Sequence, residues 1–331
     1  MKALVLAAGL GTRLRPLTNT IPKHLIPVAN KPTLHYVMDR ISETCIKDVG
    51  VVIAPENGDQ IRQSLSMNPW GFKLSYITQD QPLGLAHAVI VARSFLKKES
   101  FLMFLGDNLI GGNIKDFVTH FQNSNFEASI MLKNVADPRN FGVANIDHEG
   151  MIHSLVEKPI NPESDLAIVG IYIFSPKIHS VIDVITPSKR GELEITDALQ
   201  ELIIRGKNLF GNRLKDWWID TGTISDLLRA NEILINQQNH LKIRGTVDKL
   251  SEISGKVIIG HGTRIESSEI LGPGIIGNNC VIKNSQIGPN TSIDNNCLLE
   301  KVSINNSIIM ENCKVSNVRL YDNLVGENVM V

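Results

Sequence analysis

Residues 1–27 read MKALVLAAGLGTRLRPLTNTIPKHLIP. The apolar run 4–8 leads directly into a loop that carries glycines and cations, with few acidic residues in the same stretch. These glycines and cations are Gly9, Gly11, Arg13, Arg15 and Lys23. Glycine lets the backbone approach a ligand closely and adopt conformations closed to other residues, while exposed N–H groups and cationic side chains suit phosphate oxygens. The segment therefore predicts a buried strand followed by a polyphosphate-binding loop.

Two common phosphate-binding motifs do not fit this loop. A P-loop ends in Gly-Lys-Ser/Thr, and the loop contains no Lys-Ser/Thr pair. A dinucleotide-binding fingerprint requires a third glycine where this chain has Leu14. The loop therefore belongs to another class of phosphate site.

The chain has 331 residues and a formal net charge of −1. Its length predicts two domains with a sizeable core. Nucleic-acid binding is not expected, because the chain has no overall positive field. The sequence contains no run of about 18 apolar residues that could span a bilayer, and its first apolar run is too short for a signal peptide. We therefore expect a soluble, cytoplasmic protein that does not bind membranes.

Cysteine and histidine spacings give no sign of a metal site. The cysteines are Cys45, Cys280, Cys297 and Cys313. They form no CxxC pair, and most lie in apolar-periodic sequence, so we expect buried structural thiols rather than metal ligands or disulfides. The nine histidines show no HxH or HExxH spacing, so zinc is not expected.

Residues 1 to about 225 alternate short apolar runs with helical patterns. Strands are predicted at 4–8, 49–54, 74–78, 101–105, 128–133 and 169–174. Helices are predicted at 35–44, 59–66, 85–95, 114–123 and 195–205. This alternation indicates an α/β fold with a mostly parallel, Rossmann-like sheet covered by helices on both faces. Ligands bind at the carboxyl ends of such strands, so the opening loop and the segment 106–108 are expected to share one cleft.

Beyond residue 240 the sequence changes to aliphatic residues at nearly sixfold intervals, with Asn and Gly between them. They are Ile259, Ile265, Leu271, Ile276, Ile287, Ile293, Leu299, Val315, Leu320 and Val325, several followed by Gly. Such hexads are typical of a parallel β-helix, in which each turn stacks on the last. We predict a short, irregular left-handed β-helix of hexapeptide repeats, with a β-sandwich as the alternative. The predicted domains are 1–240 and 241–331.

The loop sequence LAAGLGTRLRPLT at 6–18, followed by Pro22-Lys23, resembles the signature of the sugar-1-phosphate nucleotidylyltransferases. Further matching segments occur in the family's order at 79–88, 106–108, 165–174, 191–197 and 218–223. Segment 191–197 most closely resembles the glucose-1-phosphate thymidylyltransferases of this family. The resemblance covers nearly the whole chain, including a carboxy-terminal β-helix as in the family's longer members. It implies the nucleotide-diphospho-sugar transferase fold.

The resemblance implies a Mg²⁺-dependent reaction of dTTP with glucose 1-phosphate. The sugar phosphate would attack the α-phosphorus in line and give dTDP-glucose and pyrophosphate. Since Ala7-Ala8-Gly9 replaces the Ala-Gly-Gly of many thymidylyltransferases, a UTP- or GTP-using pyrophosphorylase stays open. A non-catalytic sugar-nucleotide-binding regulator is a further alternative. For the β-helix, acetyl transfer would depend on His261, its only histidine, and we expect a homo-oligomer assembled partly through the β-helix instead.

Four residues are expected to carry the chemistry. In the resembled family, the counterpart of Arg13 holds the β- and γ-phosphates and that of Lys23 the α-phosphate. Mg²⁺ needs one or two carboxylates and takes its remaining ligands from water and phosphate. Asp107, after the apolar run 101–105, supplies one carboxylate. The resemblance assigns the second to Asp220.

Nucleotide and sugar contacts follow from strand-end residues and from the resemblance. The carboxamide of Gln79 offers both a donor and an acceptor to a pyrimidine edge. The full expected nucleotide-binding set is Leu6, Ala8, Gly9, Gly11, Thr12, Arg13, Gln79, Pro82, Gly84 and Asp107. Glu157 and Lys158 could be a weak surface ion pair, but together they suit sugar hydroxyls and a phosphate. The expected sugar-phosphate set is Gly142, Glu157, Lys158, Val169 and Gly170, with Glu194 as a helix-cap or wall residue.

Overall fold

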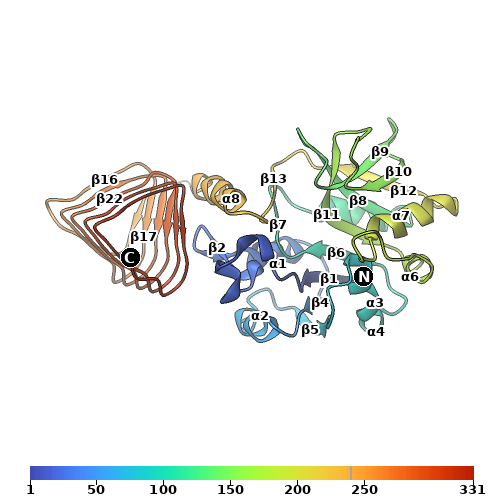
Figure 1. Ribbon diagram of the computed structural model, residues 1–331, viewed down its shortest axis with the longest axis horizontal. Coiled ribbons are helices and arrows are strands. Elements are labelled where there is room, and N and C mark those ends of the chain that lie inside the picture. Colours follow the sequence, from blue (N-terminus) through green and yellow to red (C-terminus); the bar gives the residue numbers. More distant parts are fainter. Residues whose placement is uncertain (239–240) are drawn as a thin grey trace. The chain divides into compact units, whose positions relative to one another are not determined.

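The computed structural model describes residues 1–238 and 241–331 (Figure 1). The chain forms two compact units. The first consists of Met1–Leu10, Ile21–Leu25 and Leu34–Asp220. The second consists of Gly11–Thr20, Ile26–Thr33 and Thr221–Val331. The domain boundary predicted after residue 240 falls at positions 239–240, which lie outside the described residues.

The first unit contains a nine-stranded sheet. Its strands are β1 (Lys2–Ala7), β4 (Asp48–Ile53), β5 (Lys73–Thr78), β6 (Phe101–Leu105), β8 (Ala128–Asn134), β9 (Gly142–Ile146), β10 (Ile152–Glu157), β11 (Leu166–Phe174) and β12 (Leu209–Arg213). The order is β10-β9-β11-β6-β1-β4-β5, with β8 paired to β11 and to β12. Strand β1 is buried throughout and pairs in parallel with β4 and β6, as continuous apolar runs do when both sheet faces are covered. This confirms the predicted Rossmann-like, mostly parallel fold.

Three strands of the sheet, β9, β10 and β12, were not predicted, because their sequences are not apolar runs. Strands β10 and β12 mix buried residues with half-exposed or exposed ones, and β9 has three buried residues followed by two half-buried ones, so their sequences lack a continuous apolar core. Strand β11 is a predicted strand that runs antiparallel to β6, β8 and β9. These strands extend the parallel half of the sheet on one side.

Seven helices accompany this sheet within the described residues. They are α1 (Thr33–Ser42), α2 (Gly58–Ser64), α3 (Leu85–Val91), α4 (Arg93–Leu96), α5 (Lys115–Gln122), α6 (Ile178–Ile182) and α7 (Ile195–Ile204). The single helix predicted at 85–95 is wrong in one respect, because α3 ends at Val91 and a separate helix, α4, begins at Arg93, with Ala92 as the cap of both. The β-branched run Val89-Ile90-Val91 before the break has low helix propensity. Every helix among residues 1–238 and 241–331 is too short or too polar to cross a membrane.

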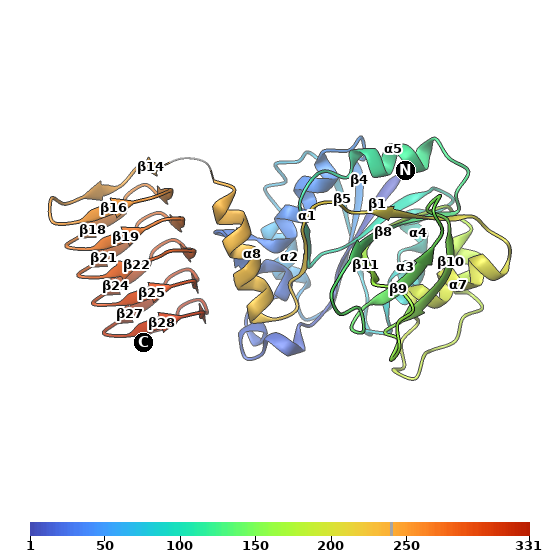
Figure 2. The ribbon, with the colours of Figure 1, turned by 90° about the horizontal axis from the view of Figure 1, so that it is seen from above.

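The second unit contains a parallel β-helix with three sheets, which Figure 2 shows as stacked coils. The first coil sheet consists of β14 (Lys242–Ile243), β17 (Val257–Ile259), β20 (Gly274–Ile276), β23 (Thr291–Ile293), β26 (Ile308–Ile309) and β29 (Leu324–Val325). The second coil sheet consists of β15 (Thr246–Val247), β18 (Arg264–Glu266), β21 (Val281–Lys283), β24 (Leu298–Glu300) and β27 (Lys314–Ser316). The third coil sheet consists of β16 (Glu252–Ser254), β19 (Glu269–Leu271), β22 (Gln286–Ile287), β25 (Ser303–Asn305) and β28 (Arg319–Tyr321). These sheets are consistent with the predicted left-handed β-helix.

The coil repeat is shorter than three hexads, which explains the irregular spacing in the sequence. Side chains one coil apart, such as Asn278 and Asn295, are separated by 17 residues, and later ones, such as Asn312 and Asn328, by 16. The spacing also misplaces Leu271, which was expected in the core. It points outward and is 42% exposed, because its strand neighbour Ile270 takes the inward position.

Stacked aliphatic side chains fill the β-helix, and asparagines turn its corners. Ile265, Ile282 and Leu299 follow one another in register on the second coil sheet and are all buried. Many corner residues are asparagines with positive φ, a conformation that Asn tolerates better than most residues. All four cysteines are reduced. Three are buried as predicted, whereas Cys45 lies in the turn between α1 and β4 and is exposed.

Helix α8 (Ile224–Asn236) and the hairpin β2 (Pro27–Val28) with β3 (Lys31–Pro32) belong to the same unit and pack on the first coil sheet. The Oγ1 of Thr223 caps α8 by accepting a hydrogen bond from the backbone N–H of Asp226. Fully buried Asn231 connects the three parts. Its Oδ1 accepts from the backbone N–H of Ala29 at 2.9 Å and from the hydroxyl of Ser292 at 2.8 Å.

The stacked core predicts a specific loss of stability. Ile282→Ala removes buried methyl groups between Ile265 and Leu299 and should cost about 2–5 kcal/mol of unfolding free energy. Urea unfolding of the full chain followed by circular dichroism measures the change. Val281→Ala, on the outward side of the same strand, is the control and should cost less than about 1 kcal/mol. Equal losses for the two variants would contradict this account of the core.

Candidate active site

A buried ion pair lies at the carboxyl end of the central strands. Lys23, in a short 3₁₀ helix (Lys23–Leu25), pairs with Asp107, which directly follows β6 and Gly106. The side chains are only 17% and 11% exposed. Gly9 makes room for the lysine, because a Cβ at Gly9 would lie 2.7 Å from Lys23 Cε. The structure thus joins two predicted catalytic residues and explains a glycine of the opening loop.

The pair fixes the ionisation of its surroundings. Burial would raise the pKa of Asp107, but the charge and hydrogen bond of Lys23 outweigh it and lower the pKa to about 2. Burial, followed by the charge of Lys23, lowers the pKa of the adjacent His24 to about 3. At neutral pH the site therefore holds a carboxylate beside a lysine and a neutral imidazole.

The second predicted carboxylate, Asp220, is tied to the first through a two-stranded ladder. Strand β7 (Asn108–Ile110) pairs antiparallel with β13 (Trp218–Asp220), and Asp220 faces Asn108 in the register. The side chain of Asn108 donates to Asp107 Oδ1 at 3.1 Å and accepts from Trp218 Nε1 at 2.6 Å. Asn108 therefore holds both the Asp107 carboxylate and the strand that carries Asp220. Its role was not anticipated, although it stands directly beside Asp107 in the sequence.

The donor set fits a magnesium ion better than a transition metal. Among residues 1–238 and 241–331, no three His, Cys, Asp or Glu side chains gather into a metal-binding cluster. An ionised Asp107 with Asp220 nearby in register supplies the one or two carboxylates that Mg²⁺ takes from proteins, the rest coming from water and phosphate. Lys23 Nζ contacts one carboxylate oxygen of Asp107, Oδ2. The residues present therefore suit a hard cation that arrives with a phosphate ligand.

On the predicted nucleotide side, Gln79 is held by the loop that follows β5. Its Nε2 donates to the carbonyl oxygen of Gly84 at 3.2 Å and lies 3.0 Å from His87 Nδ1. Gly84 has a φ of 100°, and a Cβ there would lie 2.5 Å from the carbonyl oxygen of Leu193. Only glycine fits this position. The amide group of Gln79 is therefore already oriented by protein contacts.

The other predicted nucleotide-binding residues of the first unit differ in exposure. Leu6 is buried at the end of β1, Ala8 is half-buried just after it, and Pro82 is exposed. The structure gives no side-chain contact that assigns them a base.

Most of the predicted sugar-side residues line one cavity of about 240 Å³. Gly142 from β9, Glu157 from β10, Lys158 just after it and Gly170 from β11 all line it, together with Asp220. Val169 is fully buried in β11 and does not line it. The remaining walls include Tyr172, together with Asn108, Arg190 and Trp218, which the sequence did not single out for this site.

Glu157 and Lys158 lie within a network of charges rather than as an isolated surface pair. Lys158 Nζ is 3.9 Å and Arg190 Nη2 is 4.0 Å from Glu157 Oε1. Arg190 Nη2 also contacts Glu194 at 3.1 Å, while Glu194 occupies the N-cap position of α7. Burial, followed by the charge of Glu194, raises the pKa of Glu157. Lys158 has a φ of 44°, a strained backbone conformation of the kind that clusters at functional sites.

Gly11, Thr12 and Arg13 belong to the second unit. Gly11 has a φ of 65° and precedes a 3₁₀ helix (Thr12–Leu14) that carries Arg13. The guanidinium of Arg13 packs against Gly222, where a Cβ would lie 2.6 Å from Nη2. Arg13 is exposed and forms no ion pair among residues 1–238 and 241–331, so it can receive an anion.

Comparisons with known proteins give one consistent result. The profile of the nucleotidyl transferase family matches residues 2–237. A glucose-1-phosphate thymidylyltransferase from Streptomyces griseus is 42% identical over all of this chain and 93% of its own length. A Bacillus anthracis structure assigned as a glucose-1-phosphate thymidylyltransferase, solved with sucrose, is 36% identical, with a TM-score of 0.67 over 73% of this chain and 98% of its own. A UDP-glucose pyrophosphorylase solved with UDP-glucose is 27% identical, with a TM-score of 0.66 over 71% of this chain and 98% of its own.

The ionised state of Asp107 predicts a pH dependence of stability. Its folded-state pKa lies below the usual 3.8, so it contributes stability above about pH 4, and this contribution is lost as the pH falls toward 2. The stability difference between the wild type and Asp107→Asn should therefore shrink over that interval. Acid titration of both proteins at fixed urea concentrations measures it. A difference that stays constant from pH 5 to about pH 2 would contradict the ion pair.

Proposed function

Since the chain belongs to the nucleotidyl transferase family, we propose that it joins glucose 1-phosphate to dTTP and gives dTDP-glucose and pyrophosphate. The observation that supports this most directly is the cavity that combines Glu157 and Lys158 with Asp220. A sugar phosphate needs a carboxylate for its hydroxyls and a cation for its phosphate, and the cavity supplies both. Asp220 also lies opposite Asn108, the neighbour of Asp107, so the sugar pocket adjoins the proposed phosphate-transfer residues.

The reaction requires positioning and charge neutralisation but no covalent enzyme intermediate. A phosphate oxygen of glucose 1-phosphate forms a bond to the α-phosphorus of dTTP, and the bond between that phosphorus and the bridging oxygen breaks in line. The electron pair leaves with pyrophosphate. The nucleophile is already an anion, so no general base is needed.

In this scheme Lys158 binds the phosphate of the sugar substrate, and Glu157 accepts hydrogen bonds from the hexose hydroxyls. Lys23 leaves its contact with Asp107 to stabilise the charge that develops around the α-phosphorus. Arg13 binds the departing pyrophosphate. The support for Arg13 is its motif and its exposed guanidinium.

Asp107 and Asp220 would hold Mg²⁺, which would neutralise phosphate charge and orient the triphosphate. The protein's own contribution is to keep Asp107 ionised, through Lys23, and to fix β13 through Trp218 and Asn108. Arg190 extends the positive charge of the sugar pocket and limits repulsion between Glu157 and Glu194.

We further propose that residues 1–240 act as the nucleotidylyltransferase domain and 241–331 as a β-helix domain that assembles the chain into a homo-oligomer. A UTP-using pyrophosphorylase is the second candidate. Ala8 and the 27% identity to a UDP-glucose pyrophosphorylase favour it. GTP use and non-catalytic binding have no specific structural support.

A substrate panel tests the activity. The protein is incubated with Mg²⁺, a sugar 1-phosphate, and dTTP, UTP, GTP, CTP or ATP in turn, while released pyrophosphate is measured. We expect the fastest release with dTTP and glucose 1-phosphate. Faster release with UTP or GTP would move the assignment to the corresponding pyrophosphorylase. No release with any pair would refute nucleotidyl transfer.

Substitution of the two carboxylates tests the phosphate-transfer residues. Asp107→Asn and Asp220→Asn keep the side-chain shape but remove the charge, and each should lower turnover by about two orders of magnitude or more. Asp116→Asn, at an exposed position in the first turn of α5, is the matched control and should keep wild-type turnover. Near-normal turnover in either site variant would remove that residue from the mechanism.

A further inference from the structure

The Arg13 segment, Gly11–Thr20, belongs to the same compact unit as the β-helix. The carbonyl oxygen of Gly11 ties the segment together. It accepts a hydrogen bond from the backbone N–H of Leu14 at 2.9 Å and another from the hydroxyl of Thr18 at 2.8 Å. Arg13 lies between Gly11 and Leu14 in the sequence. A displacement of the chain around Thr18 is therefore passed on to Arg13 through this shared carbonyl.

The last coil of the β-helix packs against this segment at Gly326, which directly follows β29. A Cβ at Gly326 would lie 3.1 Å from Leu17 Cδ1, closer than the separation of about 3.5–4.0 Å at which carbon atoms pack best. Leu17 is half-buried and directly precedes Thr18. The backbone of Gly326 is itself held, because the buried thiol of Cys313 donates to its carbonyl oxygen at 2.9 Å. The absence of a side chain at Gly326 therefore gives Leu17 its place on the last coil.

The guanidinium of Arg13 is connected to the β-helix by a second route. It packs against Gly222, which lies just before α8. Helix α8 in turn rests on the first coil sheet through Asn231, whose Nδ2 donates to the carbonyl oxygen of Asn290 at 3.1 Å. The β-helix thus supports the backbone beside Arg13 through Leu17 and its guanidinium through α8.

We propose that the last coil of the β-helix positions Arg13 for the phosphates of the nucleotide, with Leu17 and Gly326 as positioning residues. The inference rests on the proposed function, in which Arg13 binds the departing pyrophosphate. A cation on a segment that could shift would lose conformational freedom when it binds phosphate, and that loss weakens binding. A segment already packed on a rigid coil avoids most of this loss, so its cation is held ready for the phosphate charge. The β-helix therefore takes part in nucleotide binding from a distance.

The two segments that flank Lys23 in the sequence are anchored on different coils. Residues 11–20 precede Lys23 and pack on Gly326 in the last coil. Residues 26–33 follow it, and there Asn30 Nδ2 donates to the carbonyl oxygen of Ile293 at 2.6 Å, on an earlier coil. A change at the last coil should therefore act on Arg13 and leave the anchor of the later segment in place.

Kinetics of the full chain in the reverse direction test this inference, because pyrophosphate and dTDP-glucose then bind as separate substrates. Gly326→Val would push Leu17 off the coil and should raise the KM for pyrophosphate roughly tenfold. The KM for dTDP-glucose should stay unchanged. Gly326 does not have a positive φ, so valine meets the leucine there without added backbone strain. A protein that is merely destabilised would contain fewer active molecules, which lowers kcat and leaves both KM values unchanged.

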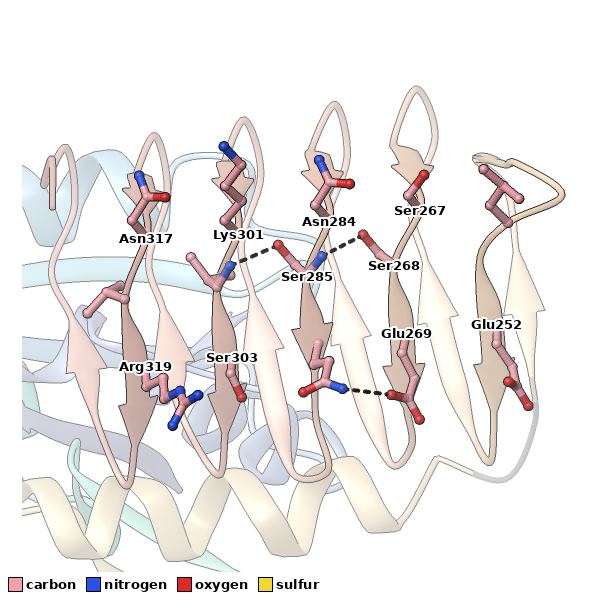
Figure 3. A pocket seen from close by; sticks show the side chains of 14 residues that line it. Glu252, Ser267, Ser268, Glu269, Asn284, Ser285, Lys301, Ser303, Asn317 and Arg319 are labelled. Carbon is pink, nitrogen blue, oxygen red and sulfur yellow. Dashed lines mark hydrogen bonds between the residues drawn. The ribbon is translucent and has the colours of Figure 1, made fainter.

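A second substitution and a control on the same coil complete this experiment. Leu17→Ala in the Gly326→Val background makes room for the valine and should bring the KM for pyrophosphate back to within about threefold of the wild-type value. Arg319→Val is the matched control. Arg319 is exposed on β28 of the last coil, and Figure 3 shows its side chain on the outer face of the third coil sheet. This variant should alter neither KM.

Three kinetic results would each overturn the inference. They are a wild-type KM for pyrophosphate in Gly326→Val, an equal rise in the KM for dTDP-glucose, and a double variant no better than Gly326→Val.

Hydrogen exchange of the protein without substrate separates this inference from the proposed reaction. Gly326→Val should speed amide exchange in residues 11–20, because a segment that loses packing opens more often. Unchanged exchange there would overturn the positioning role whatever the activity. Faster exchange in a protein whose wild type turns over no substrate pair would contradict the proposed function and still support the placement of the Arg13 segment by the last coil.

Discussion

The proposed active site depends on one buried ion pair between Lys23 and Asp107. Burying two charges costs solvation energy that only close contact and further hydrogen bonds offset, so the surrounding backbone has to bring both groups together. Gly9 and Gly106 allow this, because a Cβ at either position would collide with its neighbours. The pair keeps Asp107 ionised at neutral pH despite its burial. A carboxylate ready to bind a hard cation is the direct consequence.

The residue that follows Asp107 connects this ion pair to regions that lie far apart in the sequence. Asn108, next to Asp107, binds Trp218 across 110 positions and pairs in register with Asp220. Trp218 in turn contacts Phe141 at 5.0 Å between ring centroids, and both rings line the sugar-side cavity. A change at Asn108 would therefore disturb the proposed phosphate-transfer and sugar-binding residues together. This shared support explains why both halves of the proposed reaction can depend on a short two-stranded ladder.

What the sequence could predict follows from how each element buries its residues. Strands β1, β4 and β6 are continuous apolar runs and were predicted, and the motif residues Lys23 and Asp107 do meet. Strands β9 and β10 carry Gly142 and Glu157, but both are short and include half-buried or exposed residues, so their sequences resemble those of loops. The place of Arg190 in the site could not be predicted from the sequence for a different reason. No local sequence pattern marks it as a site residue, because its contacts with Glu194 and, at 4.0 Å, with Glu157 form only in the folded chain.

In the β-helix, the register between coils decides which side chains lie next to one another on the surface. Three strict hexads would give a coil of about 18 residues. The observed coils have 17 and later 16 residues, so an alignment that assumes about 18 places the wrong residues next to one another. In that alignment Leu271 is a core residue and the acidic and basic residues of the third coil sheet fall into no order. With the observed pairing, Glu252, Glu269, Gln286, Ser303 and Arg319 form one row. The order of these residues along the row is therefore a property of the coil length, which the corners set and the composition does not reveal.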